Sequence, residues 1–165
     1  MVELRPLLEE EREEFIRRNQ AAFLEALAEE MPEGEEVISR EEILESLLAP
    51  KEVYWENELV GGVVVQIDLE TKRNSLDLLF VDGNHKGKGL GLTIWQAIEQ
   101  AYPDTEVWET HTPHFEVRNI HFYVNKCGFQ IVEFFNPAHP MEHVPNFPDA
   151  ELFFRFEKRM KELER

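Results

Sequence analysis

The stretch over residues 76–100 constrains the fold more than any other part of this sequence. An apolar strand ends at Val81, and the loop Lys86-Gly87-Lys88-Gly89-Leu90-Gly91 leads directly into a helix with an apolar face. Glycine lets backbone N–H groups approach an anion without a Cβ atom in the way. The N-terminus of a helix adds unpaired N–H donors and a partial positive charge, and the two lysines add full charges. The stretch therefore predicts a cradle for a phosphate or pyrophosphate group.

Two common nucleotide-binding loops do not match this segment. A P-loop needs the pattern G-x-x-x-x-G-K-[ST], which does not occur in the chain. The dinucleotide-binding pattern G-x-G-x-x-G would end at Leu92 or at Ile94, neither of which is glycine. A dinucleotide-dependent oxidoreductase is therefore disfavoured, while a glycine-rich turn without a ligand stays an open alternative.

Hydrophobic periodicity places this loop in a mixed α/β chain. Strands are predicted over 2–7, 53–56, 59–69, 75–81, 105–110, 129–135 and 152–157. Helices are predicted from residue 9 to a stop at 31–34, over 39–50, over 90–101, and over 119–127 with Gly128 as the C-cap. The order β-α-α-β-β-β-α-β-α-β-β predicts a single domain over 1–165, with a mixed sheet and helices on its faces. The second, third and fourth strands are joined by the short turns 57–58 and 72–74, so we expect them to be antiparallel neighbours.

Charge and composition exclude several classes of protein. The formal net charge of −17 argues against a nucleic-acid partner, because a phosphate backbone would be repelled. The single cysteine allows no intramolecular disulfide, no apolar run is long enough to span a membrane, and the acidic N-terminus is unlike a secretory signal. We therefore expect a cytoplasmic protein with no membrane partner. Residues 1–50 hold 15 glutamates and five arginines, a balance typical of solvated helix faces or of a surface that attracts a cationic molecule.

Two motifs resemble those of the GCN5-related N-acetyltransferase (GNAT) superfamily. Residues 81–91, Val-Asp-Gly-Asn-His-Lys-Gly-Lys-Gly-Leu-Gly, are close to its V-x-P-x-x-R-G-K-G-I-G loop, with Gly83 for proline and Lys86 for arginine. Residues 119–129, Asn-Ile-His-Phe-Tyr-Val-Asn-Lys-Cys-Gly-Phe, are similar to its N-x-x-F-Y-E-K-x-G-F helix. The predicted element order is also that of the superfamily. The resemblance covers nearly the whole chain and implies a GNAT-like acyltransferase fold.

The second motif departs from the superfamily in one spacing. Tyr123 lies five residues before Gly128, where the superfamily usually has four. One extra helical residue turns a side chain by about 100°. Either a local bulge absorbs the extra residue, or Val124 takes the place of the tyrosine.

The resemblance implies roles for the motif residues. The implied cofactor-binding residues are Leu79, Phe80 and Val81 for the pantetheine arm, Lys86, Gly87, Lys88, Gly89, Leu90 and Gly91 for the pyrophosphate, and Asn119 for the arm of the cofactor. Tyr123 would donate a proton to the leaving sulfur. Glu109 or Asp77 would act as the base through water, unless these carboxylates are structural partners of an arginine or a backbone group.

The implied activity is that of an acetyl-CoA-dependent N-acetyltransferase. It would transfer the acetyl group directly to a primary amine of a small molecule or a protein, without a metal. A non-catalytic CoA-binding or sensor module of the same fold is the alternative, and a homodimer stays open. Cys127 is interpreted as a buried core thiol rather than a nucleophile. His111 and His114, with Glu109, are interpreted as surface or substrate-lining residues rather than metal ligands.

Overall fold

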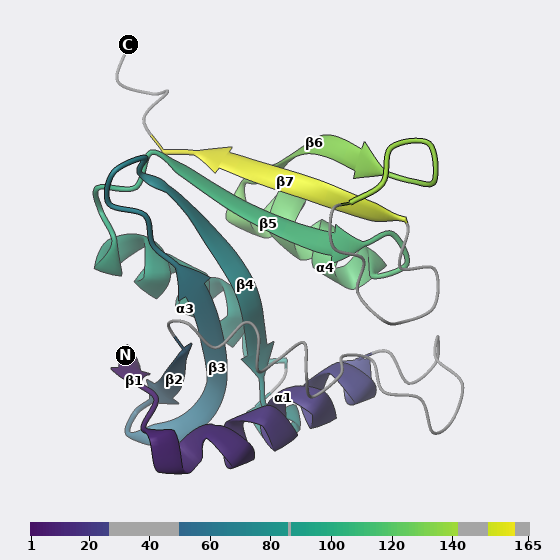
Figure 1. The fold of residues 1–165 in the computed structure, drawn as a ribbon. Coiled ribbons are helices and arrows are strands. Elements are labelled where there is room, and N and C mark those ends of the chain that lie inside the picture. Colours follow the sequence, from purple (N-terminus) through teal and green to yellow (C-terminus); the bar gives the residue numbers. More distant parts are fainter. Residues whose placement is uncertain (27–49, 86, 142–151, 161–165) are drawn as a thin grey trace. The chain divides into compact units, whose positions relative to one another are not determined.

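The computed structural model describes residues 1–26, 50–85, 87–141 and 152–160 (Figure 1). The helix predicted over 39–50 falls, except for Pro50, outside these residues, and so does Lys86. The structure forms two compact units. The first unit comprises Met1–Val65 and Asp77–Ala101, and the second comprises Gln66–Leu76 and Tyr102–Arg165. The organisation as a single domain over 1–165 stays a prediction.

Strands and helices alternate much as the periodicity predicts. In chain order the elements are β1 (Val2–Pro6), the 3-10 turn η1 (Glu9–Glu11), α1 (Arg12–Ala26), β2 (Pro50–Trp55), β3 (Glu58–Gln66), β4 (Arg73–Val81), the 3-10 turn η2 (Gly83–His85), α3 (Leu90–Ala101), β5 (Val107–Pro113), α4 (Val117–His121), the π turn η3 (Phe122–Cys127), β6 (Gln130–Phe135) and β7 (Phe153–Arg159). Within the described ranges, seven strands form one sheet in the order β1-β2-β3-β4-β5-β7-β6. Both antiparallel and parallel pairs occur, which confirms the predicted mixed α/β fold.

Antiparallel pairing of β1 with β2 and of β2 with β3 builds the strands of the first unit. The turn between β2 and β3 lies at Glu56 and Asn57, one residue earlier than predicted. These two residues have φ of 51° and 66°, and two successive positive φ values give the tight turn whose twist fits antiparallel strands. The predicted β2–β3 pairing is confirmed with this shift.

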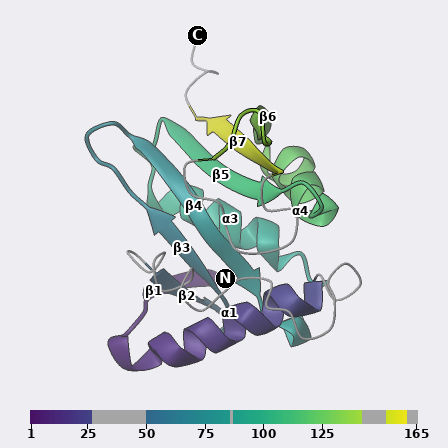
Figure 2. The same ribbon diagram turned by 45° about the vertical axis from the view of Figure 1, so that its right-hand side comes forward.

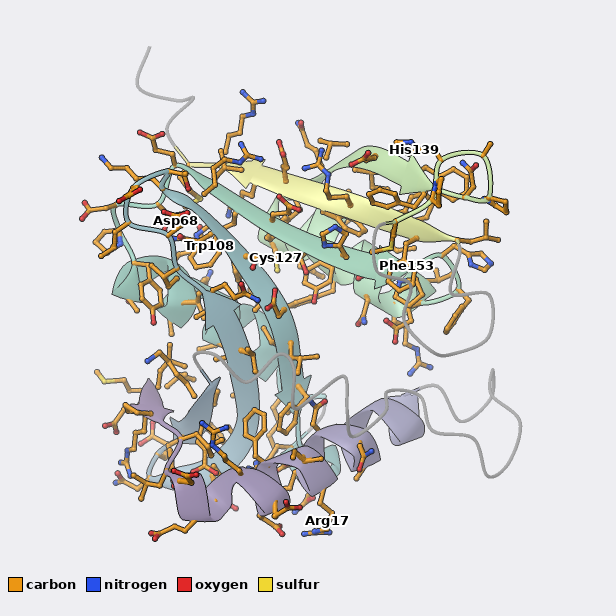
Figure 3. The ribbon with its side chains drawn as sticks, in the orientation of Figure 1. Arg17, Asp68, Trp108, Cys127, His139 and Phe153 are labelled. Carbon is orange, nitrogen blue, oxygen red and sulfur yellow. The ribbon has the colours of Figure 1, made fainter. Side chains whose placement is uncertain are left out.

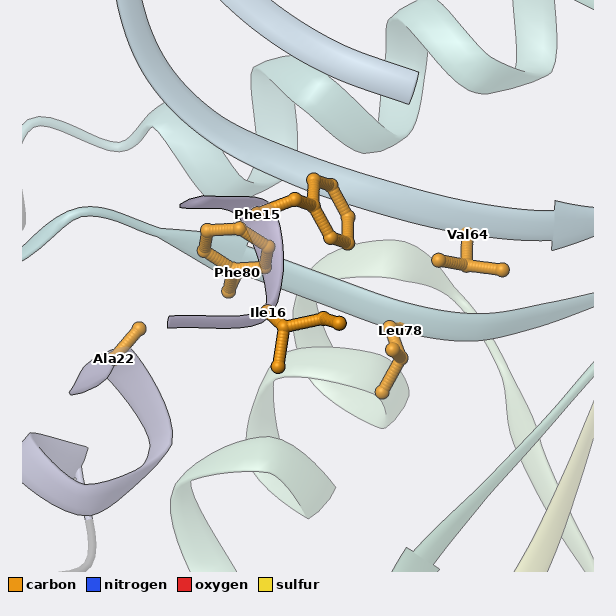
Figure 4. Close-up of a cluster of buried hydrophobic side chains, with 6 residues drawn as sticks. All are labelled: Phe15, Ile16, Ala22, Val64, Leu78 and Phe80. Carbon is orange, nitrogen blue, oxygen red and sulfur yellow. The ribbon is translucent and has the colours of Figure 1, made fainter. Parts of the chain in front are cut away.

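The core of the first unit lies between α1 and the strands. Phe15, Ile16 and Ala22 of α1 pack against a set of strand side chains, namely Val64 of β3 with Leu78 and Phe80 of β4 (Figure 4). The Phe15 and Phe80 rings meet edge to face at 5.3 Å between centroids, a favoured aromatic geometry. Helix α3 lies on the opposite face of these strands from α1 (Figure 2). Each of the two helices buries one apolar stripe, as the spacing of their apolar residues predicts.

The second unit is built around β5 and β7. These strands pair antiparallel along their whole length, from Val107↔Arg159 to Pro113↔Phe153, and β6 pairs with the other side of β7. Strand β5 therefore runs three residues beyond the predicted end at Thr110, because β7 supplies backbone partners there. Trp108 and Cys127, labelled in Figure 3, are both buried in this unit. The interpretation of Cys127 as a buried thiol is confirmed.

Among the helices that the structure describes, none is both long enough and apolar enough to cross a membrane.

Candidate active site

The loop between β4 and α3 has the backbone that its glycines predict. Gly87 and Gly89 have φ of 83° and 71°, values that a residue with a Cβ atom seldom adopts. A Cβ placed at either position would meet no heavy atom within 4 Å. Both glycines therefore border open space, and α3 begins directly after them. This arrangement fits a phosphate group held by backbone N–H groups at a helix N-terminus.

Lys88 is held beside this loop by a histidine and a tryptophan. Its Nζ lies 3.5 Å from Nδ1 of His85 and 5.4 Å from the centroid of the Trp55 ring. A lysine ammonium only donates, so His85 Nδ1 accepts and its Nε2 carries the proton. That Nε2 lies 3.3 Å from Oε1 of Glu58, which accepts. His85 therefore contacts both neighbours, Lys88 through Nδ1 and Glu58 through Nε2.

A buried arginine anchors the strand end that precedes the loop. Arg18 of α1 donates from Nη2 to Oδ2 of Asp82 at 2.8 Å, and its Nη1 lies 3.6 Å from Oε1 of Glu52. The Arg18 side chain is 9% exposed, so this ion pair ties α1 firmly to the start of the loop. A hollow of about 500 Å³ opens beside it, lined by Glu14, Arg17, Arg18, Ala21, Ala22, Asp82, Gly83 and Asn84. Sequence analysis missed Arg18, because no local pattern links it to Asp82.

The backbone of Leu79, Phe80 and Val81 lies beyond the end of the β4–β5 ladder. Parallel pairing of these two strands covers only Arg73–Ser75 and Val107–Glu109. After it, the hydroxyl of Thr110 donates to the carbonyl oxygen of Leu76 at 2.9 Å. Leu79, Phe80 and Val81, which the resemblance implies bind the pantetheine arm, therefore lie after the last paired residue of the β4–β5 ladder.

The π turn η3 carries Tyr123 and takes up the extra residue of the second motif. It covers Phe122–Cys127 and ends at Gly128, whose φ of 88° is left-handed. The backbone N–H of Phe129 donates to the carbonyl of Tyr123 at 2.9 Å, which closes the widened turn. The alternative in which a local bulge absorbs the insertion is confirmed, and so is Gly128 as the C-cap.

Tyr123 is buried in the second unit. Its ring packs against Phe129 and Phe156, with centroids 5.6 Å and 5.7 Å away. Burial raises the pKa of the Tyr123 hydroxyl well above its ordinary value, the charges of Glu116 and Cys127 raise it further, and a hydrogen bond with Thr110 opposes them. The hydroxyl therefore keeps its proton throughout the physiological pH range.

The Asn119 side chain faces a carboxylate at the start of the same helix, α4. Its Nδ2 donates to Oε2 of Glu116 at 2.7 Å, and Glu116 is buried. Sequence analysis did not single out Glu116. Its position three residues before Asn119, at the start of a helix, is the only signal the sequence offers.

Glu109 of β5 lies near two arginines and a histidine. Its Oε2 is 3.8 Å from Nη2 of Arg73 and 3.6 Å from Nη1 of Arg155, and its Oε1 is 3.7 Å from Nε2 of His111. These contacts support the alternative in which Glu109 is a structural partner of arginine. Neighbouring residues of a strand point to opposite faces. Glu109 therefore faces away from Thr110 and Tyr123.

The two histidines weighed as metal ligands contact aromatic rings. His111 stacks on Phe135 at 6.0 Å, and His114 meets the Phe115 ring edge to face at 5.7 Å. In the part of the chain that the structure describes, no group of three or more His, Cys, Asp or Glu side chains is arranged to hold a metal ion.

Many of the N-terminal glutamates lie in 27–49, outside the described residues. Those in 1–26 include Glu3, which pairs with Arg5 at 3.0 Å, and Glu14, which pairs with Arg17. Glu11 accepts from the backbone N–H of Leu8 at 3.1 Å. Part of the acidic charge is therefore engaged locally.

The predicted site residues fall into two groups. Asp77, Leu79, Phe80, Val81, Gly87, Lys88, Gly89, Leu90 and Gly91 belong to the first unit, whereas Glu109, Asn119 and Tyr123 belong to the second. Each group is complete within its own unit except for Lys86, which is outside the described residues.

Comparisons with known proteins connect both groups to one family. A family model described as "Acetyltransferase (GNAT) family" matches residues 5–129. The uncharacterized protein YrkN of Bacillus subtilis (strain 168) is 44% identical over 163 residues, which cover 90% of this chain and 88% of YrkN.

Two solved structures are similar to the chain in fold. The PaiA N-acetyltransferase of Thermoplasma acidophilum, in complex with coenzyme A, aligns with a TM-score of 0.69 at 16% identity, over 97% of this chain and 99% of that one. The ribosomal-protein-S18-alanine N-acetyltransferase of Escherichia coli aligns with a TM-score of 0.68 at 13% identity, over 96% and 94% of the two chains. Similarity at these identities establishes the fold.

Proposed function

Because the chain belongs to the acetyltransferase (GNAT) family, we propose that it is an acetyl-CoA-dependent N-acetyltransferase. It transfers the acetyl group directly to a primary amine of a small molecule or a protein. The open glycine loop before α3, with Lys88 held beside it, is the observation that carries the proposal. A relative in fold that was crystallised with coenzyme A supports the same cofactor.

The cofactor-binding roles follow from the local chemistry. The backbone N–H groups of Gly87, Gly89 and the first turn of α3 would hold the pyrophosphate, together with Lys86 and Lys88. The backbone at Leu79–Val81 would pair with the pantetheine arm, because the β4–β5 ladder has ended before it. Acetyl-CoA supplies an acetyl group activated as a thioester.

Tyr123 and one carboxylate, Glu109 or Asp77, are proposed to move protons in this reaction. When the amine nitrogen bonds to the acetyl carbon, the carbon–sulfur bond breaks and the sulfur needs a proton. The Tyr123 hydroxyl would donate it, and its raised pKa means that the proton is present at physiological pH. The base that takes the proton of the amine through water would be Glu109 or Asp77; the contacts of Glu109 with Arg73 and Arg155, on the face of β5 opposite to Tyr123, favour Asp77.

The acceptor is proposed only by chemical class. The fold relatives named above include an enzyme described as acting on an alanine of a ribosomal protein, which supports an amine acceptor. The buried free thiol of Cys127 fits a reducing compartment and supports a cytoplasmic location. Strand β6, last in the strand order, exposes Ile131, Val132 and Phe134, which supports the homodimer alternative.

The proposal is tested by isothermal titration with acetyl-CoA, CoA and NAD⁺ in parallel. We expect both CoA species to bind and NAD⁺ not to bind. The Lys86→Ala/Lys88→Ala variant should bind acetyl-CoA at least about tenfold more weakly, because it loses charge-assisted contacts to phosphate. Lys72→Ala, in an exposed turn of the second unit, is the matched control. Absence of binding by either CoA species would overturn the proposal.

The sensor alternative is separated from catalysis by turnover. The sensor alternative is suggested by the unusual spacing of Tyr123. The π turn accommodates the extra residue and therefore weakens this alternative. Tight CoA binding without turnover of any amine in a broad panel would favour the sensor.

A further inference from the structure

Glu116 is a buried carboxylate at the start of α4. The residue is only 6% exposed, and ionised glutamate is seldom buried without a partner. Its backbone carbonyl accepts from the N–H of Ile120 at 3.0 Å, so the main chain already begins the helix. Its side chain makes no capping hydrogen bond to α4. An acidic side chain at a helix start usually caps the helix, and this role does not account for the burial of Glu116.

The carboxylate determines which way the Asn119 amide faces. Asn119 Nδ2 donates to Glu116 Oε2 at 2.7 Å. An ionised carboxylate only accepts hydrogen bonds, so the NH₂ group of the amide must face it and Oδ1 must point away. The Asn119 side chain is partly exposed. It therefore presents an acceptor of defined orientation to a ligand.

We propose that Glu116 is a positioning residue that orients Asn119 Oδ1 to accept an amide N–H of the pantetheine arm, an inference that rests on the proposed acetyl-CoA-dependent activity. The arm of CoA carries two secondary amides, each with one N–H donor. An asparagine free to rotate would often present its NH₂ group to that donor, and the two donors would repel each other. An amide held in one orientation avoids this repulsion and loses less conformational entropy on binding.

The same carboxylate also acts on the proposed proton donor. After burial, the charge of Glu116 is the largest cause of the raised pKa of Tyr123. One buried residue thus influences both Asn119 and Tyr123, which lie one turn apart on consecutive helical segments.

The test exchanges donor and acceptor between the two positions. Asn119→Asp places two carboxylates face to face, and we expect acetyl-CoA to bind at least about tenfold more weakly. Glu116→Gln removes the charge and permits the flipped amide, with a loss of several-fold expected. In the double variant E116Q/N119D, the introduced glutamine amide can donate to the introduced carboxylate, whose second oxygen again points outward. This variant should therefore bind acetyl-CoA within about threefold of the wild type.

A further readout separates positioning from a structural role. Alkaline titration of tyrosinate absorbance without CoA should show a lower pKa of Tyr123 in Glu116→Gln than in the wild type. Tyr123→Phe identifies its signal among the three tyrosines of the chain. Glu106→Gln, an exposed glutamate of the same unit, is the matched control and should change neither quantity.

The outcomes distinguish this inference from the activity on which it rests. If the wild type binds acetyl-CoA but Glu116→Gln binds equally well, or if the double variant binds as weakly as Asn119→Asp, the positioning role is wrong and the activity stands. A loss of affinity that merely follows a lowered unfolding temperature also contradicts it. If the wild type does not bind acetyl-CoA, both proposals fail.

Discussion

At the scale of single residues, burial decides what Tyr123 can do. The hydroxyl is enclosed by the second unit, and its pKa rises because the phenolate would lose its hydration there. A tyrosine that stays protonated at every physiological pH can donate a proton, but it cannot serve as a base. The chemistry proposed for it therefore follows from its surroundings as much as from its residue type.

Replacement of Tyr123 by phenylalanine tests this role. We expect kcat to fall by about 100-fold or more, with little change in the KM for acetyl-CoA, because only the hydroxyl is removed. The pH dependence of kcat between about pH 6 and 9 should keep its shape, since the Tyr123 hydroxyl does not titrate in that range. Tyr102→Phe, a half-buried tyrosine of the same unit, serves as control. Turnover of Tyr123→Phe at the wild-type rate would exclude the hydroxyl as the proton donor.

At the scale of elements, one inserted residue is accommodated by widening a helical turn. The insertion before Gly128 is readable in the sequence, but its effect depends on whether the helix can open to a π turn there. Packing of Tyr123, Cys127 and Phe129 in the core favours the register in which all three are buried. The left-handed Gly128 then ends the turn and directs the chain into β6.

Gly128 should therefore resist substitution by residues with a Cβ atom. Gly128→Ala is expected to lower the free energy of unfolding by about 1–2 kcal/mol, because alanine disfavours φ near 88°. The new Cβ would have only ordinary contact with Lys158, at 3.5 Å, so the cost is conformational. Gly128→Asn should cost less, since asparagine tolerates the left-handed region. Urea unfolding measures both, and equal losses for the two variants would contradict a conformational origin.

At the scale of the whole molecule, arginines pair with carboxylates that come from several strands. In the second unit, Arg73 and Arg155 both contact Glu109 and Glu157, and Arg155 also reaches Glu133 at 2.7 Å. The carboxylates come from β5, β6 and β7, so the network links these three strands. Burial pushes the pKa of Glu157 upward, but hydrogen bonds from Arg155 and Arg73 outweigh it and lower the pKa. Hydrogen bonds from His139 and Arg155 lower the pKa of Glu133.

The network predicts how stability depends on pH. A carboxyl whose folded pKa lies below its unfolded value stabilises the fold above the unfolded pKa, and this contribution is lost as pH falls through the folded pKa. Arg155→Gln should lower the free energy of unfolding by about 2 kcal/mol at about pH 7, because three carboxylates lose a partner. The difference from the wild type should shrink below about pH 4, the ordinary range of glutamate. A difference that stays the same from neutral pH to about pH 3 would count against the network.

Local conformation could be predicted from the sequence because it depends on residues that are close along the chain. The glycines of the loop between β4 and α3 and the cap at Gly128 have the backbone expected of them, since positive φ is a property of the residue itself. The apolar periods predicted most strands and helices to within a few residues. The GNAT family could be recognised from two short motifs for the same reason.

Only the tertiary structure decided which distant residues meet. Strand β7 pairs between β5 and β6, Arg18 reaches Asp82 across 64 positions, and Glu109 acquires two arginine partners. Side chains far apart in sequence have no local signal of contact, because their pairing depends on the packing of whole elements. The raised pKa of Tyr123 likewise comes from burial and from Glu116. The sequence by itself therefore determined the phosphate loop and the family, whereas the electrostatics of the proposed catalytic residues were decided by long-range packing.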